Sequence, residues 1–182
     1  MNFYKMTTEK LKELKTWAQV KSPKPFQPAL SYALDWLAPE LLGTGFRMLE
    51  VSDFSLKGLI PARNSNHDFQ QEIHQGLILN ASLELCRAFL QKQMAESFFH
   101  LTASKIEISK KQKWSKDLEL LLETDQNVID EFFINFQKNK KSEIEFEIKI
   151  TSKASSGIGV EKSKKSDWIK LRLNLEKTEL IA

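Results

Sequence analysis

Cysteine and histidine are scarce in this 182-residue chain, which has one cysteine and three histidines. The single cysteine, Cys86, excludes an intrachain disulfide and indicates a reducing compartment. None of these residues stands at ligand spacing, so we expect no metal site and no cofactor. The formal net charge is only +3. No basic region carries interleaved stacking aromatics, so we expect no nucleic-acid partner.

Long hydrophobic runs are also lacking. The apolar stretches are interrupted every few residues, which excludes a membrane-spanning helix. Residues 1–15 place lysines among polar residues and lack the apolar core of a signal peptide. We therefore expect a cytoplasmic protein without membrane insertion. Apolar residues make up 41% and charged residues 28% of the chain, which is ordinary globular composition.

The first 40 residues show helical periodicity. Apolar residues recur at spacings of three and four within 9–20, and again from Leu30 to Leu37. Pro23 and Pro25 separate the two stretches, and Pro39 ends the second. We therefore expect extra N-terminal helices in a segment 1–40, followed by the main domain at 41–182.

The period then changes to two, which is typical of strands. The alternation predicts strands at 54–60, 98–108, 118–124, 144–151 and 168–175, and a weaker one at 45–51, with a tight turn at Ser52-Asp53. Polar residues between the apolar ones indicate an antiparallel sheet with one wet face. A flexible loop is expected at 152–166.

Two helices interrupt these strands. Residues 73–93 are apolar around most of the helix circumference, which predicts a long buried helix of about 30 Å. A shorter amphipathic helix is expected near Val128–Phe136, capped by Asp125. A sheet wrapped around one long helix buries the apolar faces of both. The sequence thus predicts an α+β domain.

This layout is that of the hot-dog superfamily, and the loop before the long helix strengthens the likeness. The stretches Arg63–His67 and Ile73–Leu77 resemble the signature of the thioesterase-like hot-dog branch, in which an Asn-containing loop leads into a His-Gly-Gly or similar helix start. Two positions depart from that pattern. Gln75 replaces the first glycine, and Leu83 stands where phenylacetyl-type thioesterases carry the helix carboxylate, so Glu84 is one residue displaced.

The resemblance implies a site for thioester hydrolysis. The backbone amide near Gly76, at a helix N-terminus, would stabilise the oxyanion together with Asn66. Glu84 would be the base that activates water, because apolar neighbours raise the pKa of a carboxylate. The alternatives are that Gly76 is only a convenient small residue, that Asn66 only turns the loop, and that Glu84 is paired with Arg87 on a solvated stripe.

Other residues are candidates for substrate binding. These are His67, His74, Gln75 and Asn80. A histidine at a helix start is also often structural. Cys86 is expected to be inert, because burial raises the pKa of a thiol. Lys110, Lys111, Lys113 and Lys116 would either meet the phosphates of coenzyme A or form a solvated turn.

The resemblance therefore implies an acyl-thioester hydrolase acting on acyl-CoA or acyl carrier protein (acyl-ACP) thioesters. It also implies a homodimer or tetramer, with Asn66 and Glu84 from different chains at one site. The alternative is a non-catalytic acyl-ligand or partner-binding module of the same fold, since fold does not fix function. A dehydratase of this fold is a third candidate.

Overall fold

The computed structural model of the protein describes residues 41–94, 99–152 and 167–177. The helices expected in segment 1–40 and the loop expected at 153–166 lie outside these residues. The described elements are, in chain order, β1 (Arg47–Val51), β2 (Ser55–Ile60), the one-turn 3-10 helix η2 (Asn64–Asn66), α3 (Gln75–Gln93), β3 (Phe99–Ser109), β4 (Leu118–Glu123), α4 (Gln126–Asn139), β5 (Lys141–Ser152) and β6 (Asp167–Lys177).

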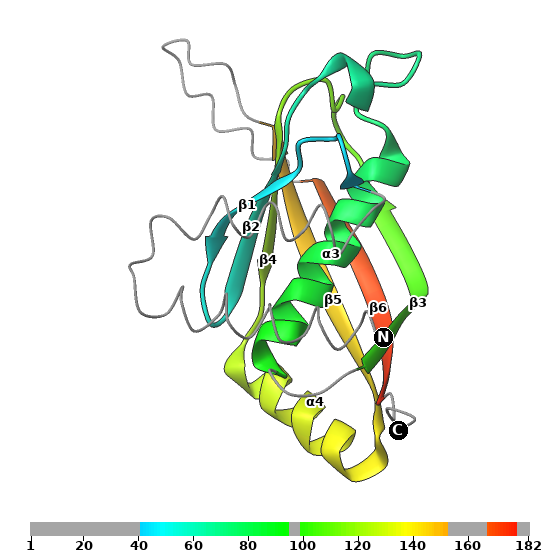
Figure 1. Cartoon of the computed structure of the whole chain (residues 1–182). Coiled ribbons are helices and arrows are strands. Elements are labelled where there is room, and N and C mark those ends of the chain that lie inside the picture. The colour runs from blue at the N-terminus through cyan, green and yellow to red at the C-terminus, as the bar shows by residue number, and fades with distance from the viewer. Residues whose placement is uncertain (1–40, 95–98, 153–166, 178–182) are drawn as a thin grey trace, which may run out of the picture.

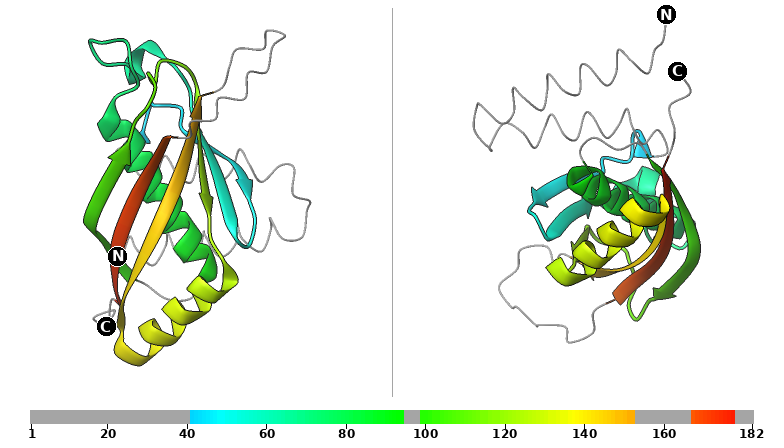
Figure 2. Two further views of the ribbon diagram at one scale, coloured as in Figure 1. Left: turned by 180° about the vertical axis from the view of Figure 1, so that it is seen from behind. Right: turned by 90° about the horizontal axis from the view of Figure 1, so that it is seen from below.

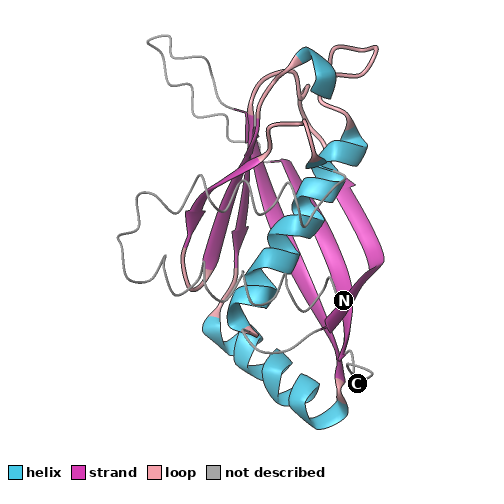
Figure 3. Cartoon of the chain, in the orientation of Figure 1, coloured by secondary structure: helices cyan, strands magenta, loops and turns pink. Residues whose placement is uncertain are grey.

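The strands form one antiparallel sheet in the order β1-β2-β4-β5-β6-β3. The sheet curves around α3, and α4 lies across one end of it (Figures 1 and 2). Figure 3 shows the same division into one helical layer and one sheet. The predicted α+β class and the sheet wrapped around a long helix are confirmed.

Alternation of side chains places the core on the concave face of the sheet. On β5, the apolar residues Ile144, Phe146, Ile148 and Ile150 are all buried. The charged residues between them are exposed, and several form cross-strand ion pairs on the convex face, such as Arg172 with Glu145 at 3.1 Å. One face is therefore apolar and the other is wet, as the sequence predicts.

The long helix packs on this concave face through the row that contains Ile78, Leu85 and Phe89. The ring of Phe89 meets that of Phe146 edge to face, with centroids 5.7 Å apart. Gly58 in β2 is required beneath the helix, because a Cβ there would lie 2.7 Å from the ring of Phe46. Close packing of α3 on the sheet fixes the position of the helix start.

The predicted start of the long helix at Ile73 is wrong by two residues. The N–H of Ile73 donates to the carbonyl of Trp114 at 2.6 Å, and Ile73 forms a β-bridge with His67. Ile73 is thus held in extended structure by a residue 41 positions away. The shorter helix, α4, does follow Asp125 as predicted, although no cap hydrogen bond from the Asp125 side chain is present among the described residues.

Candidate functional site

The first turn of α3 is capped by a histidine side chain. His74 is the N-cap residue, and its Nδ1 accepts the N–H of Gly76 at 3.1 Å. A Cβ at Gly76 would lie 3.0 Å from two atoms of the His74 ring, so a glycine suits this contact. His74 is exposed. Its imidazole therefore occupies the place where a substrate oxygen would accept the same N–H.

Asn66 is buried, with 2% of its surface exposed, and both hydrogens of its amide are used. Its Nδ2 donates to the carbonyls of Thr44 and Pro61, each at 2.8 Å. Its own backbone carbonyl accepts the N–H of His74 at 2.9 Å. Asn66 thus joins the segment before β1, the loop after β2 and the start of α3.

The neighbouring candidates His67 and Gln75 differ in their surroundings. Both ring nitrogens of His67 are shielded from solvent and have no hydrogen-bond partner among the described residues. A shielded imidazole without partners costs free energy, because it has lost its hydrogen bonds to water. Gln75 is exposed in the first turn of α3. Both residues lie at the same end of the helix as Gly76.

Glu84 is buried, with a side chain only 3% exposed, and its Oε1 lies 2.5 Å from the Nη1 of Arg87. The predicted pair with Arg87 is therefore present. The accompanying prediction of a solvated stripe is wrong for Glu84, although the Arg87 side chain is 45% exposed. A guanidinium at this distance favours the charged carboxylate and competes for the lone pairs that a general base would use.

The spacing along α3 separates Glu84 from the helix start. Eight residues at 1.5 Å each put Glu84 about 12 Å along the axis from Gly76. Gly76 and Asn80 lie on the side of α3 away from the row that faces the sheet, since each residue turns the helix by about 100°. Asn66, His67, His74 and Gly76 are gathered at one end of α3, and Glu84 of the same chain is not among them.

The start of α3 is also fastened to the β3–β4 connection, which sequence analysis missed. Asp167, fully buried, accepts the indole N–H of Trp114 and the backbone N–H of Lys111, both at 2.7 Å. Lys110 forms an ion pair with Glu72 and lies over the ring of Trp114. The position of Trp114 inside a lysine-rich turn is the one feature of the sequence that suggests a buried anchor there. Its acceptor, Asp167, lies 53 residues away, so the hydrogen bond itself could not be predicted.

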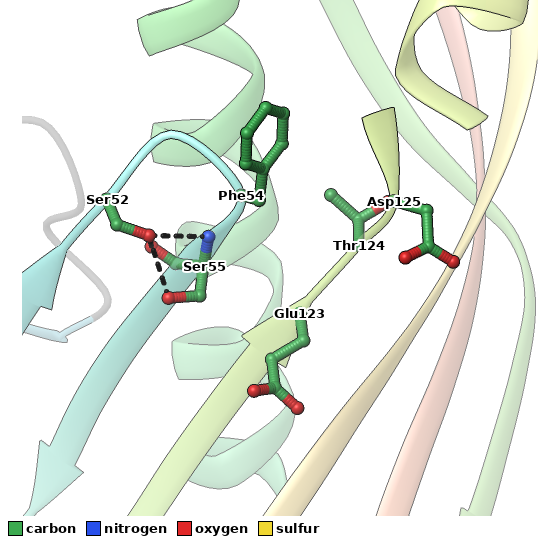
Figure 4. A pocket seen from close by; sticks show the side chains of 6 residues that line it. All are labelled: Ser52, Phe54, Ser55, Glu123, Thr124 and Asp125. Carbon is green, nitrogen blue, oxygen red and sulfur yellow. Dashed lines mark hydrogen bonds between the residues drawn. The ribbon is translucent and has the colours of Figure 1, made fainter. Parts of the chain in front are cut away.

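A polar hollow lies at the other end of α3, at the β1–β2 turn. It measures about 410 Å³ and is lined by Ser52, Phe54, Ser55, Glu123, Thr124 and Asp125 (Figure 4). The turn beside it is tied to the last residues of α3 through Asp53. No group of histidine, cysteine and carboxylate side chains within the described ranges is arranged to hold a metal ion.

Two further observations bear on the candidates. Cys86 is fully buried, and burial raises the pKa of its thiol, so the thiolate is disfavoured. Within the part of the chain that the structure describes, no helix is both long and apolar enough to span a membrane.

Comparison of the structure with solved structures reveals similar folds at low identity. A Chlorobaculum tepidum protein of unknown function is 17% identical, with a TM-score of 0.69, and 86% of this chain covers 98% of that one. A Pseudomonas aeruginosa protein described as a probable thioesterase is 12% identical, with a TM-score of 0.64 and coverage of 86% and 97%. A thioesterase family protein from Silicibacter pomeroyi is 7% identical, with a TM-score of 0.57 and coverage of 81% and 96%.

The chain has the hot-dog fold. No protein-family model and no curated protein sequence matches it. The fold expected from the order of the elements and from the loop before the long helix is thus confirmed by the structure.

Proposed function

We propose that this hot-dog protein hydrolyses acyl thioesters of coenzyme A or of acyl carrier protein. The observation that carries the proposal is the first turn of α3, where the N–H of Gly76 is engaged only by the exposed side chain of His74 among the described contacts. A thioester carbonyl oxygen that displaced the imidazole would accept this N–H at the positive end of the helix dipole. Proteins of similar fold described as thioesterases support the same chemistry.

In this proposal, Glu84 removes a proton from a water molecule that attacks the thioester carbon. The tetrahedral oxyanion is held by the N–H of Gly76. When it collapses, the C–S bond breaks, Glu84 returns the proton to the departing sulfur, and the thiol and the carboxylic acid leave. His67, His74, Gln75 and Asn80 would contact the substrate. Asn66 would join the oxyanion site only by releasing Thr44 or Pro61, so its main contribution is to position the loop.

Because Glu84 and Gly76 of one chain are about 12 Å apart along α3, a site that uses both must take them from different chains. We therefore propose a homodimer or a tetramer with shared sites, in the cytoplasm. The 11-residue strand β3 supports this, because it stands at the edge of the described sheet and exposes Ile106 and Ile108. Open edges of this kind are normally paired or covered.

The test is a panel of acyl-CoA and acyl-ACP thioesters assayed by release of free thiol. Glu84→Gln should lower turnover by roughly 100-fold or more, because it removes the proton acceptor and keeps the side-chain size. The matched control is Glu145→Gln, which removes a carboxylate that is also paired with an arginine but lies on the convex face. Light scattering of the same samples should give a dimer or a larger assembly. Hydrolysis that survives Glu84→Gln, or a strict monomer that is active, would contradict this site.

One observation favours the non-catalytic alternative. The carboxylate of Glu84 is already engaged by Arg87. A protein that binds acyl-CoA with a rise in melting temperature, yet releases no thiol from any member of the panel, would be a binding module.

A further inference from the structure

The lysines of the β3–β4 connection differ from those on the sheet. Four lysines on the strands, Lys57, Lys105, Lys149 and Lys170, each pair with a carboxylate, and in the connection Lys110 pairs with Glu72. By contrast, Lys111, Lys113 and Lys116 are exposed and have no ion-pair partner within the described residues. We call these three residues the lysine patch. Three cations within six positions repel one another, and an anion bound among them removes that repulsion.

The backbone that carries the lysine patch is held by several contacts beside the start of α3. These contacts include the hydrogen bonds from Ile73 to Trp114 and from Trp114 to Asp167, and the ion pair of Lys110 with Glu72. On the other side, the carboxylate of Asp117 accepts the N–H of Ala62 at 2.7 Å. The connection and the loop before α3 therefore lie together at one end of the molecule (Figure 1).

An aromatic ring projects from the same end. Phe69 is 91% exposed, the largest exposed fraction among the large apolar side chains of the described residues. Its turn is ordered by Asp68, whose carboxylate accepts the N–H groups of Gln70 and Glu72 at 2.8 and 3.1 Å. These hydrogen bonds, with Glu72 first, lower the pKa of Asp68. The turn ordered by Asp68 thus exposes the Phe69 ring to solvent. A planar nucleotide base can stack on the face of an exposed aromatic ring.

We propose that the lysine patch and Phe69 bind the nucleotide end of coenzyme A, with the phosphates at the lysines and the adenine on the ring. This inference rests on the proposed function and deepens it, because it selects coenzyme A as the carrier. A single turn with three cations matches the clustered phosphates of one nucleotide. An acidic carrier protein would need a basic surface of about 800 Å², whereas the three lysines occupy the single connection between β3 and β4.

The test measures binding of coenzyme A itself by calorimetry, so it does not depend on hydrolysis. Lys111→Gln, Lys113→Gln and Lys116→Gln together should weaken binding roughly 10-fold or more, and the loss should shrink in high salt. The matched control changes to Gln three lysines near the end of α4, at the start of β5 and at the end of β6: Lys138, Lys141 and Lys177. These ends of the elements lie opposite to the β3–β4 connection (Figure 1). The control removes the same charge and should change the affinity less than about 2-fold.

Phe69→Ala should weaken binding of coenzyme A and of adenosine 3′,5′-bisphosphate by at least roughly 5-fold. Where thiol release occurs, acyl-pantetheine thioesters without the nucleotide should be hydrolysed equally by wild type and by the lysine variant. Equal losses in the patch and control variants would overturn the inference, as would wild type that does not bind coenzyme A. A lysine variant impaired only toward acyl-ACP would overturn it in favour of a carrier protein. If coenzyme A binds as expected and no thiol is released, the hydrolase proposal fails and this inference stands.

Discussion

The two ends of α3 are held by different kinds of interaction. At its start, buried Asn66 bonds to two backbone carbonyls, and buried Asp167 receives the indole N–H of Trp114. At its end, Lys92 pairs with Asp53 at 2.9 Å, and Gln93 donates to the Asp53 carbonyl at 2.6 Å. The side chains of Lys92 and Asp53 are 36% and 80% exposed.

The difference between buried and exposed contacts indicates which end of α3 must keep one precise backbone arrangement. Buried polar groups lose much when a partner is removed, so they fix one arrangement of the backbone. Exposed pairs are screened by water and salt, and they tolerate alternatives. The fixed end is the one that presents Gly76, His74 and the lysine patch. The arrangement of buried hydrogen bonds therefore supports a site at the start of the helix.

The largest loss should follow Asn66→Ala. It removes two hydrogen bonds and leaves the carbonyls of Thr44 and Pro61 without their donor, which should lower the free energy of unfolding by about 3 kcal/mol. Urea denaturation followed by circular dichroism measures this change. The control is Asn64→Ala in the same 3-10 turn, where the side chain is exposed and the loss should stay below about 0.5 kcal/mol. Similar losses in both variants would remove the distinction between the two ends.

An intermediate loss should follow Trp114→Phe. The phenyl ring fills most of the space of the indole but donates no hydrogen bond, so Asp167 keeps only the N–H of Lys111. A lost hydrogen bond to a buried carboxylate should cost about 2 kcal/mol of unfolding free energy. Trp168→Phe is the control, because the Trp168 indole N–H has no acceptor among the described residues and its ring is half-buried. If the control loses as much as Trp114→Phe, packing and not the hydrogen bond holds this end.

Local pattern was sufficient to predict most of the fold. The alternation on β5 and β6, like the apolar pattern of the long helix, shows which residues face the core. This works because side-chain direction follows directly from the period of the element. The start of α3 was misplaced for the opposite reason. Ile73 is extended because of its hydrogen bond to Trp114, and no local signal reports a bond between residues 41 positions apart.

The same limit applies to the candidate site. The pair of Glu84 with Arg87 follows from a spacing of three on a helix, and the sequence predicts it. The burial of Glu84 does not follow from that spacing. Asn66 connects two segments of backbone through hydrogen bonds to the carbonyls of Thr44 and Pro61. Only the folded chain brings these carbonyls next to the Asn66 amide. This amide was therefore assigned to the substrate when the protein itself uses both hydrogens.

The smallest effect should follow Asp53→Ala at the end of α3. The substitution removes an exposed ion pair with Lys92, but the backbone carbonyl of residue 53 can still accept from Gln93. Exposed pairs contribute about 0.2–1 kcal/mol, so the free energy of unfolding should fall by no more than about 1 kcal/mol. Part of even this loss should disappear in 1 M salt, where the screening length is about 3 Å. A loss above about 1 kcal/mol that persists in salt would show that the end of α3 is held as firmly as its start, and buried hydrogen bonds at the start would then no longer single out that end as the site.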